Sequence, residues 1–305
     1  MATSTRVKSK VAPSTAVAPR AIPISLLASG LLLLISILGG VYAWRHGGVE
    51  RRAVAAAALT VEKLEVTPQP AWIRADVRAE AFRDGSLGDL SVLDRELAYR
   101  VFRAFELHAW VEKVLRVSKE PLGRVLVELR YRQPIAWVEV PSIMSPDNQD
   151  GVLPIDGHAI LLPPDDFKEE DVKPYLRISV DDLAPWGPVG TAWPDERVTG
   201  AAQIAALLDG QVNSLELHRI LVHTTTAEIR GGQAAFYELV TRQGHRILWG
   251  HAPGSETGTE ATSGDKLAHL RALAKRPDPL PNDQRLVIDL QTVTGSQLAT
   301  DAEGG

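Results

Sequence analysis

The chain has 305 residues, with 33 Lys and Arg against 38 Asp and Glu, a formal net charge of −5 and no cysteine. Without cysteine, disulfides, thiolate zinc sites, iron–sulfur ligation and a cysteine nucleophile are excluded. All 38 acidic residues but only 29 of the 33 basic ones follow residue 44, so this part has a formal charge of −9. We therefore expect no nucleic-acid partner, because such a surface needs clustered Lys and Arg.

An apolar run over residues 22–44 contains no charged residue. About 20 helical residues span the roughly 30 Å hydrocarbon core of a bilayer, so the run predicts a transmembrane helix. A cleaved signal peptide is the alternative, although its apolar region is usually only about 7–15 residues long. The helix would separate a tail at 1–21 from a juxtamembrane stalk at 45–58.

The charges around this run predict its orientation. The tail carries four basic residues, and the first acidic residue of the chain is Glu50. Basic residues favour the cytoplasmic side, so we expect a cytoplasmic N-terminus in the inner (plasma) membrane and the bulk of the chain in the periplasm or another extracytoplasmic space.

Small residues recur along one face of the predicted transmembrane helix. These residues are Ser25, Ser29, Ser36 and Gly40. Small side chains let two helices approach closely in a membrane, so they predict a packing surface for another membrane protein. The alternative is that small residues are simply common in spanning helices.

Residues 59–132 predict a β-α-α-β-β domain. A strand at 59–66 precedes two amphipathic helices and two strands at 110–119 and 124–131. The last strand alternates apolar and mostly polar residues, which indicates a sheet covered on one face by the helices. We expect a set of apolar side chains to be mostly buried: Leu93, Leu97, Val101, Phe105, Val125, Val127 and Leu129.

Residues 133–291 predict a mainly antiparallel β-domain with flanking helices, so the fold class is α+β. A hairpin turn is expected at Asp156-Gly157, and a solvated acidic loop over 163–174. The other elements are strands at 135–140 and 151–160, a helix from Thr199 to Gly210, a meander over 215–250, a helix around 267–273 and a strand at 285–290.

Several short motifs occur in a fixed order along the chain. The first group is Trp110-Val111, Arg116, Pro121, Arg132, Pro134 and Ala136; the second is Leu153-Pro-Ile-Asp156-Gly157, Leu248-Trp249-Gly250, Lys266-Leu267 and Ile288-Asp289-Leu290. In this order the chain resembles the FtsQ/DivIB family of bacterial cell-division proteins, which have a POTRA domain followed by a β-domain. Tyr131 stands where that family usually has glutamate, and Gln291 where it usually has arginine.

The resemblance implies a non-enzymatic assembly protein at the division septum, with FtsB/FtsL-like proteins as partners. It places the partner contact on the last strand of the β-domain, where an edge strand could accept an extended segment. The expected contact residues are Leu286, Val287, Ile288, Asp289, Leu290, Gln291, Thr292, Val293, Thr294, Ser296 and Leu298. We expect no further strand to cover this edge, and residues 292–305 to form an edge strand and tail; the alternative is a frayed tail after Leu290.

Catalytic and ligand-binding motifs were sought in the same sequence. The eight histidines lack His-Glu-x-x-His spacing, and Gly-x-Ser-x-Gly does not occur. The segment from Gly258 to Lys266 departs from the phosphate-binding loop pattern, and the acidic loop lacks the ligand spacing of an EF-hand. We expect no catalytic residue, cofactor, metal or small-molecule substrate.

Two other kinds of protein remain possible at this point. One is a POTRA-bearing secretion or outer-membrane assembly component, but the roughly 160 residues of short strands do not supply the barrel pattern that it would need. The other is a membrane-anchored enzyme with an unrecognised site.

Overall fold

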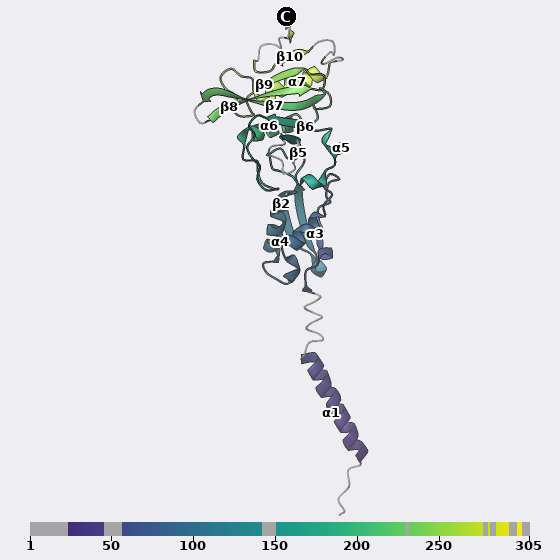
Figure 1. Ribbon diagram of the computed structural model, residues 1–305. Helices are drawn as coiled ribbons and strands as arrows, with labels where there is room; N and C mark the ends of the chain where they lie inside the picture. Colours follow the sequence, from purple (N-terminus) through teal and green to yellow (C-terminus); the bar gives the residue numbers. More distant parts are fainter. Residues whose placement is uncertain are drawn as a thin grey trace, which may run out of the picture. The chain divides into compact units, whose positions relative to one another are not determined.

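The computed structural model describes residues 24–45, 57–141, 151–229, 232–276, 280, 285–292 and 298–300. The chain divides into two compact units, residues 1–57 and 58–305. The first unit contains helix α1, and the second contains a three-stranded and an eight-stranded sheet (Figure 1).

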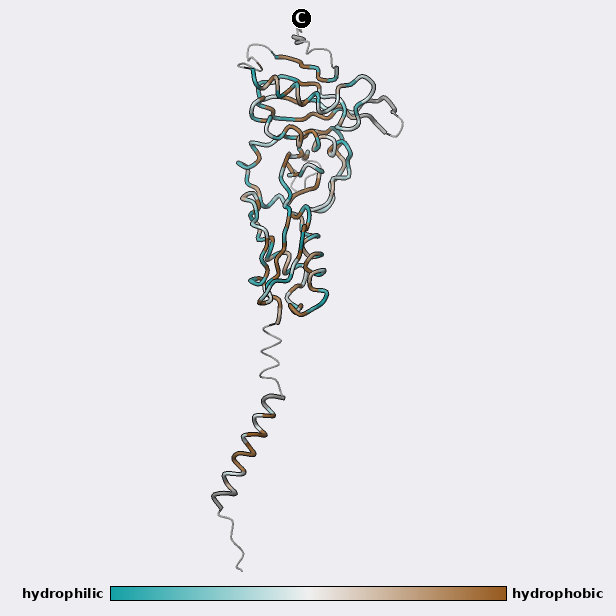
Figure 2. The backbone as a smooth tube through the Cα atoms, turned by 180° about the vertical axis from the view of Figure 1, so that it is seen from behind, coloured by the Kyte–Doolittle hydropathy of each residue, from teal (hydrophilic) through white to brown (hydrophobic). Residues whose placement is uncertain are grey.

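Helix α1 (Ile24–Arg45) covers most of the apolar run and ends one residue after it, and Figure 2 shows apolar residues along its middle. Among the described residues, no helix has both the length and the apolar character that crossing a bilayer requires. This corrects the predicted transmembrane helix over 22–44.

The packing surface predicted at Ser25, Ser29, Ser36 and Gly40 lies on α1 and stays a prediction. Ser36 and Gly40 are exposed on α1. Within the part of the chain that the structure describes, nothing lies within 4 Å of a Cβ built at Gly40.

The three-stranded sheet has the predicted β-α-α-β-β order. Its elements are β1 (Leu64–Val66), α3 (Val77–Asp84), α4 (Leu97–Glu106), β2 (Val111–Lys119) and β3 (Val125–Tyr131). Strand β3 lies in the middle, parallel to β1 and antiparallel to β2. The second α-helix and the last two strands thus lie close to the ranges expected from the sequence, whereas β1 is shorter.

The core of this domain follows the apolar stripe of α4. Leu97, Val101 and Phe105 recur every four residues and are fully buried in one cluster with alternate residues of β3. The exception among the expected core residues is Leu93, which is 80% exposed. It lies in the turn before α4, where its N–H donates to Ser91 Oγ at 3.2 Å, so its side chain is outside the helical stripe.

The eight-stranded sheet has the order β11-β10-β9-β8-β7-β6-β4-β5. Its strands are β4 (Ala136–Val140), β5 (Gly151–Ile155), β6 (Leu176–Val180), β7 (Leu217–Ile229), β8 (Gly232–Thr241), β9 (Arg246–Gly250), β10 (Leu286–Asp289) and β11 (Leu298–Thr300). Three strand pairs are parallel: β4 with β6, β6 with β7, and β9 with β10. The other four pairs are antiparallel, so the sheet is mainly antiparallel as expected, with three parallel pairs that the sequence did not predict.

Two helices connect two of the three parallel pairs and contribute to the core. Helix α6 (Glu196–Leu207) connects β6 to β7, and α7 (Ser263–Ala274) connects β9 to β10. Parallel neighbours need such crossover connections. Buried side chains of both helices share one cluster with alternate strand residues such as Ile178 and Ile220, so both helices cover the same face of the sheet. The residues in between point to the opposite face.

The two sheets are joined through the segment predicted as a solvated acidic loop. It forms a short 3-10 turn, Pro164–Asp166, and a short helix α5 (Glu169–Val172). Asp166 is buried because its carboxylate accepts the Trp110 Nε1–H at 2.5 Å and the Ala75 N–H at 3.1 Å. The prediction of a fully solvated loop is wrong at this residue.

Aromatic packing and an ion pair complete this junction. The ring of Phe167 lies 5.8 Å from that of Trp110 and 4.9 Å from that of Trp137. Arg132, which follows β3, pairs with the buried carboxylate of Asp156 at 2.7 Å. Side chains from both sheets thus meet in one unit.

Candidate functional site

The predicted partner site lies at the C-terminal end of the eight-stranded sheet. Strand β10 is parallel to β9, with Val287 opposite Arg246, and antiparallel to β11, with Val287 opposite Ala299. Since β11 covers β10, the expectation that no further strand covers this edge needs correction. The outermost strand is β11.

The predicted contact residues fall into several environments. Leu286, Val287, Ile288 and Asp289 form β10; Leu290 is buried; Gln291 and Thr292 follow it; Val293, Thr294 and Ser296 lie outside the described residues; Leu298 begins β11. They therefore do not form one continuous edge strand. Thr292 instead forms a bridge with Glu260, and the Ala261 N–H donates to the Gln291 carbonyl at 2.8 Å.

The backbone directions show which residues could accept another strand. The Leu290 N–H donates to the Leu248 carbonyl at 3.0 Å, so even-numbered residues of β10 point their backbone groups toward β9. Because these groups alternate along a strand, Val287 faces β11 and pairs with Ala299. The flanking Leu298 and Thr300 then point their N–H and C=O groups away from β10. Within the described part of the chain, no strand pairs with that outer side.

A buried charged cluster lies beside this end of the sheet. The carboxylate of Glu260 accepts Lys266 Nζ at 2.6 Å and the His251 N–H at 2.8 Å, and its other oxygen lies 2.6 Å from His251 Nδ1. The Lys266 side chain is 0% exposed, and its Nζ lies 5.3 Å from the Trp249 ring centroid. A buried ammonium of this kind needs its carboxylate partner.

Gly250 makes this arrangement possible. Its φ is +92°, a region that L side chains rarely adopt, and a Cβ there would lie 2.1 Å from Glu260 Oε1. The charged cluster therefore depends on glycine at this position. Because Thr292 forms its bridge with Glu260, the same cluster holds the residues that immediately follow β10.

The pKa of the Glu260 carboxyl reflects two opposed effects. Burial alone would raise it, because the charged form loses hydration. Hydrogen bonds from Lys266 and His251 and the charge of Lys266 together outweigh burial, so the pKa lies below its ordinary value. The carboxylate form is thus stabilised in the folded chain.

Another buried carboxylate, that of Glu238, is paired across the strands of the sheet. Glu238 on β8 pairs with Arg246 at 2.5 Å and lies 3.3 Å from His223. The described residues contain no group of three or more His, Cys, Asp or Glu that could hold a metal ion. The arrangement at the sheet end is suited to backbone pairing by β11.

Sequence reasoning missed the charged cluster, and it expected an edge strand within 292–305 but not its antiparallel pairing with β10. A signal for the cluster was present: Lys266 lies four residues before Leu270 and seven before Leu273, on the apolar stripe of α7. A charged residue on such a stripe indicates a buried partner. Residues 298–300 (Leu-Ala-Thr) are too few to show a strand pattern.

No protein-family model matches the chain, and no curated protein matches it.

Proposed function

We propose that this chain is a non-enzymatic assembly protein of the FtsQ/DivIB type. It recruits or stabilises FtsB/FtsL-like partners at the division septum, on the extracytoplasmic side. The proposal rests on the order of sequence motifs and on one structural observation, the outward backbone groups of Leu298 and Thr300 on β11.

The geometry supports binding by strand addition. An extended partner segment would accept the outward N–H groups of β11 and donate to its C=O groups, extending the sheet by one strand. Backbone pairing supplies affinity without a catalytic group or a cofactor. The charged cluster at Glu260 would keep the chain after β10 in place while the partner binds.

The positions of the family-like motifs support the same proposal. Arg132 pairs with Asp156, Trp110 donates to Asp166, and Lys266 pairs with Glu260. The residues that resemble the family therefore have structural roles in this fold.

The test uses the full chain and the extracytoplasmic part of an FtsB-like partner, with the dissociation constant measured by calorimetry. Thr300→Pro removes one outward N–H and places a ring against an incoming strand. We expect binding to weaken by about tenfold, the equivalent of about 1.4 kcal/mol.

Thr300→Val is the matched control, because it changes the same position and retains the backbone N–H. It should change the dissociation constant less than about twofold. Both variants should have the melting temperature of the parent chain. Equal binding by Thr300→Pro and the parent would contradict strand addition at β11.

A further inference from the structure

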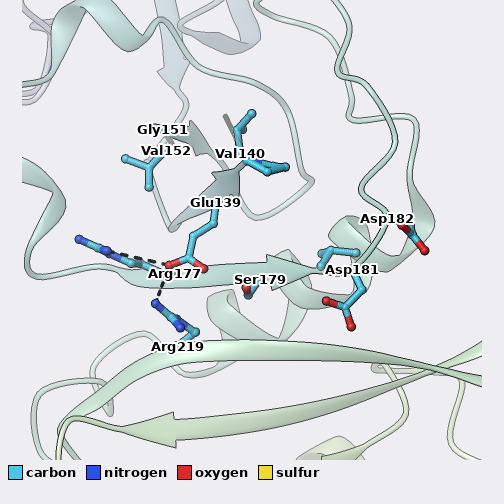
Figure 3. Close-up of a pocket in the computed structure, with 11 residues that line it drawn as sticks. Glu139, Val140, Gly151, Val152, Arg177, Ser179, Asp181, Asp182 and Arg219 are labelled. Atoms are coloured by element: carbon cyan, nitrogen blue, oxygen red, sulfur yellow. Dashed lines mark hydrogen bonds and ion pairs between the residues drawn. The ribbon is translucent and has the colours of Figure 1, made fainter. Parts of the chain in front are cut away.

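A cleft of about 710 Å³ is lined by residues of β4, β6 and β7 and the start of β5, away from the β11 edge in the strand order. Figure 3 shows Glu139, Arg177 and Arg219 together at one end of it and Asp181 toward the other. Apolar side chains, including Val152, complete the lining. The cleft is thus charged at its two ends and partly apolar between them.

The two arginines are placed unfavourably with respect to each other. Arg177 on β6 is directly opposite Arg219 on β7. Like charges in such positions destabilise a sheet unless a counter-charge is near. Glu139 on β4 supplies one carboxylate, with its Oε1 2.8 Å from Arg219 Nη2 and 3.9 Å from Arg177 Nη1. The single carboxylate of Glu139 therefore lies between two guanidinium groups.

The guanidinium groups retain unused hydrogen-bonding capacity. The Arg219 side chain is 36% exposed, and it donates to Glu139 through Nη2. Arg177 approaches Glu139 only at the long distance above, and its side chain is 38% exposed. A planar guanidinium can bind a carboxylate through two parallel N–H donors. The pair can thus accept a second carboxylate.

The pKa of His218, the residue next to Arg219, indicates a positive electrostatic potential here. Burial lowers the pKa of His218, and the charges of Arg219, Arg177 and Arg242 lower it further, against the opposing effect of Glu139. Those positive charges therefore outweigh Glu139 at this point of the sheet.

We propose that this cleft binds a single Asp or Glu side chain on an extended segment of a protein partner. The guanidinium groups of Arg177 and Arg219 hold the carboxylate, and the apolar lining takes the neighbouring side chain. Asp181 and Asp182 at the other end repel a polyanion and favour a basic residue after the acidic one. The contact uses β4, β6 and β7, and so goes beyond the proposed pairing at β11.

The test is a titration of the full chain with two capped peptides, Ac-Val-Glu-Val-Lys-Val-NH2 and its Gln counterpart, followed by fluorescence anisotropy of a labelled peptide. The Glu peptide should bind about tenfold more tightly than the Gln peptide, because only the first provides a charged acceptor. Equal binding by the two peptides, or no saturable binding by either, would overturn the proposal.

Variants locate the binding. Arg177→Gln combined with Arg219→Gln should remove the preference for Glu, and Arg219→Lys should reduce it in part, because lysine keeps the charge without the planar donors. Arg130→Gln is the matched control: Arg130 also pairs with one glutamate, Glu112, but in the other sheet. It should bind as the parent does, and loss of the preference there would overturn the assignment.

Two further titrations separate the alternatives. Inorganic phosphate that competes with the peptide as strongly as the unlabelled Glu peptide would overturn the peptide assignment and leave a simple anion site. Thr300→Pro should retain peptide binding even where it loses the FtsB-like partner. Failure at the cleft and failure at β11 are therefore distinguishable.

Discussion

Different interactions stabilise the interior of the three-stranded domain and the C-terminal end of the eight-stranded sheet. In the first, Leu97, Val101 and Phe105 pack against apolar residues of β3. In the second, the buried Lys266 and Glu260 form an ion pair beside the last strands. Apolar packing is lost by degrees as atoms are removed, whereas a buried ion pair fails when either partner is lost.

The largest expected effect tests the charged region. Glu260→Gln leaves Lys266 buried without a carboxylate and should lower the free energy of unfolding by about 3–5 kcal/mol. Urea unfolding followed by circular dichroism measures it. The double variant Glu260→Gln with Lys266→Met, which removes both charges, should recover most of this loss. A loss below about 1 kcal/mol for the single variant would mean that water reaches Lys266.

A somewhat smaller effect tests the apolar region. Leu97→Ala removes a fully buried side chain from α4 and should cost about 2–5 kcal/mol through lost contacts and a residual cavity. Leu93→Ala is the matched control four residues earlier: that side chain is exposed, and the change should stay within about 0.5 kcal/mol. Equal losses in urea unfolding would place both leucines in the same environment.

The smallest effect is the response to acid. The folded pKa of Glu260 lies below its unfolded value, so its stabilisation is fully present above about pH 4.3 and is lost as pH falls through the folded pKa. Below about pH 4.3 the melting temperature of the parent should therefore fall more steeply than that of the double variant without both charges. Parallel melting curves from pH 3 to 7 would contradict this contribution.

The sequence predicted the regular parts of the fold because their patterns are local. The stripe of α4 and the alternation of β3 each follow from one element. The mixed sheet was less accessible, because parallel pairing depends on how α6 and α7 connect distant strands. The burial of Asp166 was likewise not predictable from local sequence. It lies among other acidic residues in 163–174, and its partner Trp110 is distant in the sequence.

The sequence predicted where the candidate site lies in the chain but not which strands form it. The last strand of the sequence pattern, Leu286–Asp289, is present, yet it lies inside the sheet. The covering strand has three residues, too few for periodicity, and its register is set by pairing with β10. The arginine pair of the cleft arises likewise from register, since Arg177 and Arg219 are far apart in the sequence.

The junction at Asp166 has a mechanical consequence. One carboxylate accepts donors from Trp110 and Ala75, while the ring of Phe167 lies against those of Trp110 and Trp137. A force applied to the outer strands of the eight-stranded sheet would therefore reach the three-stranded sheet through these contacts. In single-molecule stretching, we expect the two sheets to stay together until the contacts of Asp166 and Phe167 break.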